Sequence, residues 1–139
     1  MSPAARLMSG VSLILIPTII YGGLTMLGVV SGGQYGGPAP RDLSPLQVTL
    51  YRAMHAHAGV LTLLALFIQI ALDHVALPIA AIWPLRVSAV AAPLFVSAGF
   101  VGLAYFPPLR LLLYLGALML VVMTVAVAIG LIRAGTAGV

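Results

Sequence analysis

Two histidines, His55 and His57, lie two residues apart in an apolar segment that predicts a membrane helix. A metal-binding or ionisable side chain at membrane depth is costly, so it is a functional-site candidate by default. Residues two apart on an α-helix point in nearly opposite directions, about 200° around the axis. The pair therefore cannot chelate one metal ion from a straight helix, but it can serve two sites, one on each side.

His74 is the third and last histidine in the chain. It lies about 25 Å further along a helix than His57, so it cannot reach an ion bound by either member of the pair. A site with two imidazole ligands must then take the second one from another copy of the chain or from another subunit. His74 itself, next to Asp73, is interpreted as part of an interfacial helix end.

The composition is that of an integral membrane protein, with 63% hydrophobic and 6% charged residues. In soluble domains, roughly a quarter of the residues are charged. The arginines stand singly at segment ends, which argues against a nucleic-acid-binding surface. Because the chain has no cysteine, disulfides, thiolate catalysis, iron–sulfur clusters and zinc fingers are excluded.

Four apolar stretches are long enough to cross a hydrocarbon core of roughly 30 Å, and membrane spans without β-strand alternation must be helical. We expect an all-α, polytopic protein with a single domain, residues 1–139. The four transmembrane helices are predicted at about residues 10–30, 46–72, 87–106 and 109–132.

The connections are predicted from proline, glycine and tryptophan. Residues 31–45 are rich in glycine and proline and form the polar loop, and Ser44 with Pro45 predicts the start of the second helix. The segment 75–85 contains two prolines and Trp83, so we expect an interfacial connection that leads to Arg86.

A ring of copies would bring the two histidines together. Head-to-tail interfaces close into rings, in which His55 of one chain can face His57 of the next. Small residues, Ala56, Ala58 and Gly59 among them, leave space beside the imidazoles, as a flat macrocycle would require.

The His-x-His-x-Gly pattern of His55, His57 and Gly59 resembles the tenth helix of heme-copper oxidase and nitric oxide reductase catalytic subunits. There the two histidines ligate two haems on opposite faces, and twelve helices form three four-helix arcs with pseudo-threefold symmetry. This chain is similar to a single arc, with its histidines on the second helix. The resemblance implies a ring-shaped homotrimer that rebuilds the twelve-helix core and a cytoplasmic N-terminus.

The resemblance also implies roles for cations near the predicted haem. The turn before Arg110 is similar to the family's proline-arginine turn, whose arginines pair with haem propionates, although here one arginine stands where the family has two. Arg52 could supply the second cation and Tyr51 a hydrogen bond to a propionate. The ordinary interpretations are headgroup anchors for both arginines and the aromatic belt for Tyr51. The copper-binding histidine pair and the oxidase tyrosine have no counterpart.

The expected function is a b-type haem protein of a bacterial-type plasma membrane, with one haem b per protomer bound by His55 and His57 of adjacent copies. Two imidazoles leave no open coordination position, so we expect electron transfer with an unknown donor or acceptor, or haem storage, and not catalysis of oxygen reduction. Met119 is the alternative ligand, in a His–Met haem, although core filling is the ordinary role of such a methionine.

Two interpretations without haem stay open. In the first, the chain is an accessory or scaffold subunit of a larger membrane complex, and the histidines are neutral and hydrogen-bonded to carbonyls or to hydroxyls such as Thr62 or Ser97. In the second, the imidazoles titrate in a proton pathway or bind a non-haem metal, but the four spans contain few other polar residues that could line an aqueous path.

Overall fold

Serine caps begin the first two helices. In the computed structural model, which describes residues 1–35 and 42–137, Ser2 caps α1 (Pro3–Val30) and Ser44 caps α2 (Pro45–Ala71). Ser44 and Gln47 form a capping box, in which each side chain accepts a hydrogen bond from the other residue's backbone N–H. The predicted start of the second helix is confirmed. The remainder of the loop predicted at residues 31–45 lies partly outside the described residues, at 36–41.

The third helix begins earlier than the sequence predicted. α3 spans Ile79–Leu103 and contains Pro84 near its start, so the predicted connection over residues 75–85 ends already at residue 78, and the predicted helix start at residue 87 is wrong. Proline is tolerated inside membrane helices, where neighbouring helices help to satisfy the backbone groups that it frees. As a consequence, Arg86 belongs to the helix and does not mark its edge.

A proline-rich turn leads into the last helix. A 3₁₀ turn, Pro107–Leu109, precedes α4 (Arg110–Thr136). In the described chain, four helices are long and apolar enough to cross a membrane, as the sequence predicted.

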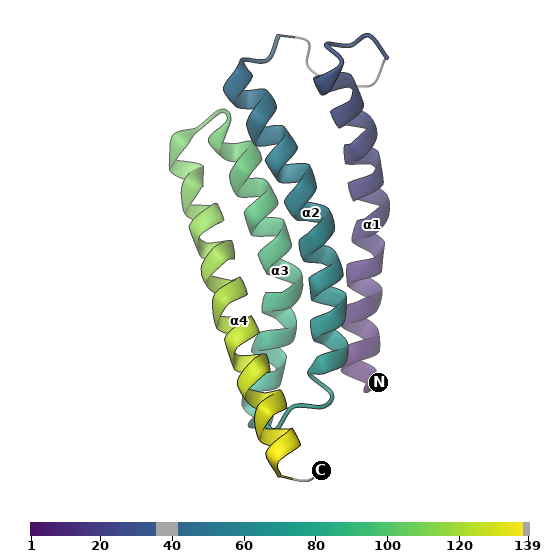
Figure 1. Ribbon diagram of the computed structural model, residues 1–139, viewed down its shortest axis with the longest axis vertical. Coiled ribbons are helices and arrows are strands. Elements are labelled where there is room, and N and C mark those ends of the chain that lie inside the picture. The colour runs from purple at the N-terminus through teal and green to yellow at the C-terminus, as the bar shows by residue number, and fades with distance from the viewer. Residues whose placement is uncertain (36–41, 138–139) are drawn as a thin grey trace.

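The four helices form an open arc. Each helix packs against the next one in the chain, and α1 and α4, the two ends of the arc, make no contact with each other in the described residues. Figure 1 shows the helices side by side in the order α1, α2, α3, α4, with both chain termini at the same end. The arc therefore leaves two helical edges without a partner from its own chain.

Close backbone contact joins α3 to α4. A Cβ atom on Gly99 would lie 2.5 Å from the backbone nitrogen of Leu113, and one on Gly116 would lie 2.8 Å from the backbone nitrogen of Val96. Only glycine fits at such a distance.

The best-packed part of the molecule lies away from the histidines. Buried side chains of α2, α3 and α4 form one cluster in the half of the bundle where α2 ends. Its members are Ala65, Ile68, Ala71, Leu72, Leu85, Ala89, Met123 and Val127. The other half contains His55 and His57, with the cavity and the groove described next.

Candidate functional site

His55 points toward α1 of its own chain. A Cβ on Gly22 would lie 3.6 Å from its Nδ1, and a Cβ on Gly23 would lie 3.4 Å from its Nε2. The half-buried imidazole therefore packs against two glycines, where larger side chains would occupy the space of the ring. It also lines a cavity of about 220 Å³ between α1, α2 and α3. Among the described residues, no side chain or backbone group forms a hydrogen bond with the ring, so the bond from His55 to Thr62 or Ser97 that the interpretation without haem allowed is not formed.

His57 lies on another side of α2 and is exposed. Its Nδ1 donates a hydrogen bond of 2.7 Å to the carbonyl oxygen of Ala53, since a carbonyl can only accept. Its ring lies against Phe100 of α3, with centroids 4.9 Å apart. In the Nδ1–H tautomer the lone pair of Nε2 has no hydrogen-bond donor among the described residues. His57 also lines a surface groove of about 180 Å³, together with Ala56, Val60 and Leu61.

The two histidines thus have different neighbours, α1 for His55 and α3 for His57, as their spacing predicted. Within the part of the chain that the structure describes, no three residues of the types His, Asp and Glu gather into a group that could hold a metal ion. A metal centre with two imidazoles would require a second chain.

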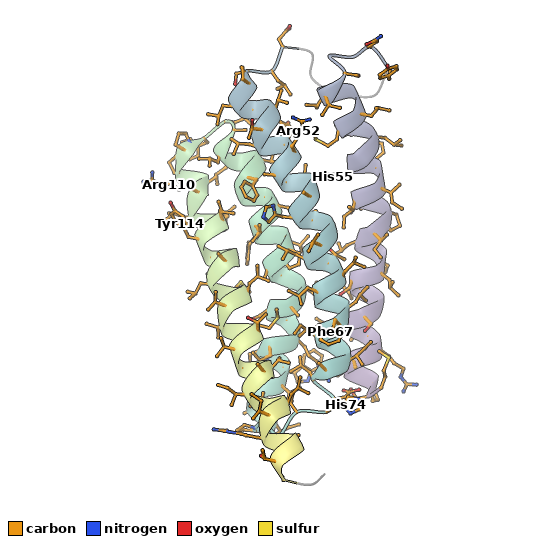
Figure 2. The ribbon with its side chains drawn as sticks, viewed as in Figure 1. Arg52, His55, Phe67, His74, Arg110 and Tyr114 are labelled. Carbon is orange, nitrogen blue, oxygen red and sulfur yellow. The ribbon has the colours of Figure 1, made fainter. Side chains whose placement is uncertain are left out.

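The predicted propionate partners lie on the same half of the molecule. Arg52 and Arg110 are both exposed, and Figure 2 shows Arg110 and Tyr114 on the edge of α4 that faces away from α3, with Arg52 and His55 on α2. No carboxylate of the described residues lies within ion-pair distance of either arginine. Both are positioned to interact with headgroups or with another molecule.

Tyr51 has a partner within its own chain. Its hydroxyl lies 2.8 Å from the hydroxyl of Tyr105, and the two rings meet edge to face, with centroids 6.4 Å apart. This contact ties the first turns of α2 to the end of α3.

Gly59 and Met119 stand apart from these contacts. A Cβ on Gly59 would meet no atom within 4 Å, so the glycine faces open space in the single chain. Met119 is partly buried on α4 and does not line the cavity beside His55 or the groove beside His57.

A buried polar network at the opposite end of the bundle was not predicted from the sequence. Arg86 is 2% exposed, and its guanidinium donates to Asp73 at 2.6 Å and to the backbone oxygen of Gln69 at 2.8 Å. Ser2 donates to the same carboxylate through its backbone N–H and its hydroxyl, at 2.6 and 2.7 Å. The network joins α1, α2 and α3.

The surroundings of Asp73 change its acidity. Burial alone would raise the pKa of this carboxyl, but the hydrogen bonds from Ser2 and the hydrogen bond and charge of Arg86 outweigh burial and lower the pKa from 3.8 to about 2. Asp73 therefore carries its negative charge at any physiological pH. His74, next in the chain, is exposed at this end, which is consistent with the predicted helix end (Figure 2).

The sequence contained a signal for this network. Gln69 and Asp73 are four residues apart in a largely apolar helical segment, where they share a face, and Arg86 follows after a short connection. Rare polar residues that recur on one face of a membrane helix predict a partner inside the protein.

Comparison with known proteins adds no relative: no family model, no curated protein and no solved structure matches this chain.

Proposed function

We propose that the chain is a membrane b-type haem-binding protein for electron transfer, in which His55 and His57 of adjacent copies are the two axial ligands of each iron. The observation that carries this proposal is the state of His57. Its Nδ1–H is bonded to the carbonyl of Ala53, and the Nε2 lone pair is free at an exposed position. Metal-bound histidines usually donate the other ring N–H to a backbone carbonyl or a carboxylate in this way.

The groove beside His57 suits one side of a flat apolar group. Phe100 packs on the imidazole, and Ala56, Val60 and Leu61 present small or aliphatic side chains. Its volume of about 180 Å³ is below the roughly 300–1,000 Å³ of sites that enclose drug-sized ligands. A macrocycle on His57 would therefore need a second copy of the chain to cover it.

His55 would have to turn in order to bind the same iron. In the single chain its ring lies over Gly22 and Gly23 of α1, and ligation by a neighbouring copy requires rotation of the side chain away from these glycines. No Cβ atom of Gly22 or Gly23 stands in the way of such a rotation.

A homotrimer is the assembly that we propose. The open arc leaves α1 and α4 without a contact to each other, and Arg110 lies on the free edge of α4 (Figure 2). In a ring, this edge would meet the next copy and could bring Arg110 near a propionate there, with Arg52 as the second cation. Tyr51 is the weaker candidate, since Tyr105 already occupies its hydroxyl. We place the trimer in a bacterial-type plasma membrane with the N-terminus in the cytoplasm.

The chemistry of such a site is limited. When bound, a haem with two imidazole ligands supplies one-electron oxidation and reduction and keeps no coordination position free for oxygen. The chain's residues would hold the group, exclude water from it and pair its propionates.

An absorption spectrum of the purified protein, oxidised and then reduced, tests the proposal. We expect the sharp bands of a six-coordinate haem, at about one haem per chain. His55→Gln and His57→Gln should each abolish these bands, because each removes one axial ligand. His74→Gln is the matched control and should leave the spectrum unchanged, because His74 lies at the opposite end of the bundle.

Colourless protein from haem-replete cells would contradict the proposal. So would a spectrum that survives both substitutions in the pair.

An accessory subunit of a larger membrane complex is the second candidate function. It is favoured by the lack of a three-residue metal group among the described residues and by the exposed apolar surface of all four helices. Under this alternative, the double variant His55→Gln/His57→Gln would still co-purify with the same partner proteins as the unchanged chain.

A further inference from the structure

The cavity beside His55 is formed by a single chain and lies at membrane depth. It measures about 220 Å³, and its lining is mostly aliphatic. Leu15 and Ile19 of α1, Ala58 of α2 and Pro93 and Leu94 of α3 supply that lining. No Asp, Glu, Lys or Arg of the described residues contributes to the wall. A cavity of this kind selects a neutral ligand.

Several polar groups border this apolar space without a hydrogen-bond partner among the described residues, and the hydroxyl of Thr62 is one of them. The ring of His55 makes no hydrogen bond with the described residues, and the hydroxyl oxygen of Ser97 is buried and likewise unpaired. Thr18, which also lines the cavity, already donates to the carbonyl of Leu15 at 2.6 Å. A buried polar group left unsatisfied costs about 1–3 kcal/mol, so the buried hydroxyl of Ser97 favours an occupant that can form hydrogen bonds, and the half-buried ring of His55 offers it a second partner.

Neither water nor a lipid chain meets both requirements. Water can form hydrogen bonds with His55 and Ser97, but it gains no favourable contact with the aliphatic wall. An acyl chain fits the aliphatic wall but leaves His55 and Ser97 unpaired.

We propose that this cavity binds the head group of a neutral, membrane-soluble molecule with a single flat ring and carbonyl or hydroxyl oxygens, the chemistry of a quinone. At about 220 Å³ the cavity is below the roughly 300–1,000 Å³ of sites that enclose drug-sized ligands, so it limits the enclosed part of an occupant to a small head group. One ring oxygen accepts the N–H of His55, and a second accepts the hydroxyl of Ser97 after rotation of that side chain. An aliphatic tail leaves through the open side of the cavity into the bilayer.

This site needs neither iron nor a second copy, so it goes beyond the proposed haem function. Because ligation of iron would turn the His55 ring away from α1, each His55 serves one of the two sites at a time.

Binding of a short-tailed benzoquinone to haem-free protein in nanodiscs is the test, measured by equilibrium dialysis against empty nanodiscs. We expect saturable binding at one molecule per chain. Ser97→Ala should weaken binding about three- to tenfold, the effect of one lost hydrogen bond. Ala58→Leu should abolish binding, because the longer side chain enters the cavity. Ala56→Leu is the matched control, since Ala56 lies in the groove beside His57, and it should bind like the unchanged protein.

Circular dichroism and gel filtration of each variant show whether it is folded, and Ser97→Ala adds no bulk that could prevent folding. The proposal would be overturned if the quinone partitioned into the protein-containing nanodiscs no more than into the empty ones. Equal binding of an analogue with the same tail and a cyclohexane ring would also overturn it, because the site would then hold any apolar group. Since the protein carries no haem in this assay, failure here is distinct from failure of the spectrum.

Discussion

The guanidinium of Arg86 is the most deeply buried charge in the described chain, and its ion pair with Asp73 is largely removed from water. Arg86→Met keeps the length of the side chain but leaves the carboxylate of Asp73 without its guanidinium partner, while the hydrogen bonds from Ser2 remain. We expect a loss of about 3–5 kcal/mol in the free energy of unfolding, the usual effect of removing one member of a buried pair. Thermal unfolding in mild detergent measures it.

Arg133→Met is the control for this substitution, because Arg133 is exposed in the last turn of α4. It should change stability little. Equal midpoints for the two variants would show that the network around Arg86 does not stabilise the fold.

The low pKa of Asp73 predicts sensitivity to acid. A carboxyl whose pKa is lower in the folded state than in the unfolded state stabilises the fold fully above its ordinary pKa of 3.8 and loses this effect as the pH falls toward about 2. The thermal midpoint should therefore drop between about pH 4 and pH 2. In Asp73→Asn that drop should disappear, at a lower overall stability, whereas Asp42→Asn, an exposed change, should keep it. A drop that persists unchanged in Asp73→Asn would assign the acid sensitivity to other groups.

Among the helices, the contact between α3 and α4 depends most on glycine. Gly99→Ala would place a Cβ against the backbone of Leu113, which cannot move without shifting α4. We expect a loss of about 1–3 kcal/mol, as for other overpacked positions. The midpoint of thermal unfolding in detergent reports it.

Gly10→Ala provides the comparison at this scale, since its Cβ would meet no atom within 4 Å. Alanine also favours helix more than glycine does, by about 1 kcal/mol. Gly10→Ala should thus unfold at the same temperature as the unchanged chain or a higher one. A Gly99→Ala protein that behaves in the same way would mean that the two helices can separate at no cost.

The helices also show how far sequence reasoning reaches. Hydropathy was sufficient to predict the number of membrane spans, and Ser44 was sufficient to predict the start of α2, because both signals are local in the sequence. The start of α3 was missed because Pro84 was interpreted as a break, although tertiary contacts tolerate it. The opposed directions of His55 and His57 followed from helix geometry, whereas the contact of His55 with Gly22 and Gly23 depends on how α1 packs, which no local pattern encodes.

At the scale of the whole molecule, the open arc predicts self-association. In native mass spectrometry from mild detergent, we expect a species of three times the 14.3 kDa of one chain. Replacing Leu118, exposed on α4, by arginine should shift the population toward single chains if that face meets another copy. Trp83→Arg changes an exposed side chain near the start of α3 and is the control. A single chain as the sole species in lipid nanodiscs would contradict the trimer.

Since α1 and α4 do not contact each other in the described residues, neither the cavity beside His55 nor the groove beside His57 holds more than a small group within one chain. A larger ligand must be enclosed jointly by several copies, so its binding would depend on the concentration of the chain in the bilayer. Diluting the protein with added lipid would then release such a ligand and separate the copies together, whereas a molecule in the pocket beside α1 would stay with each chain.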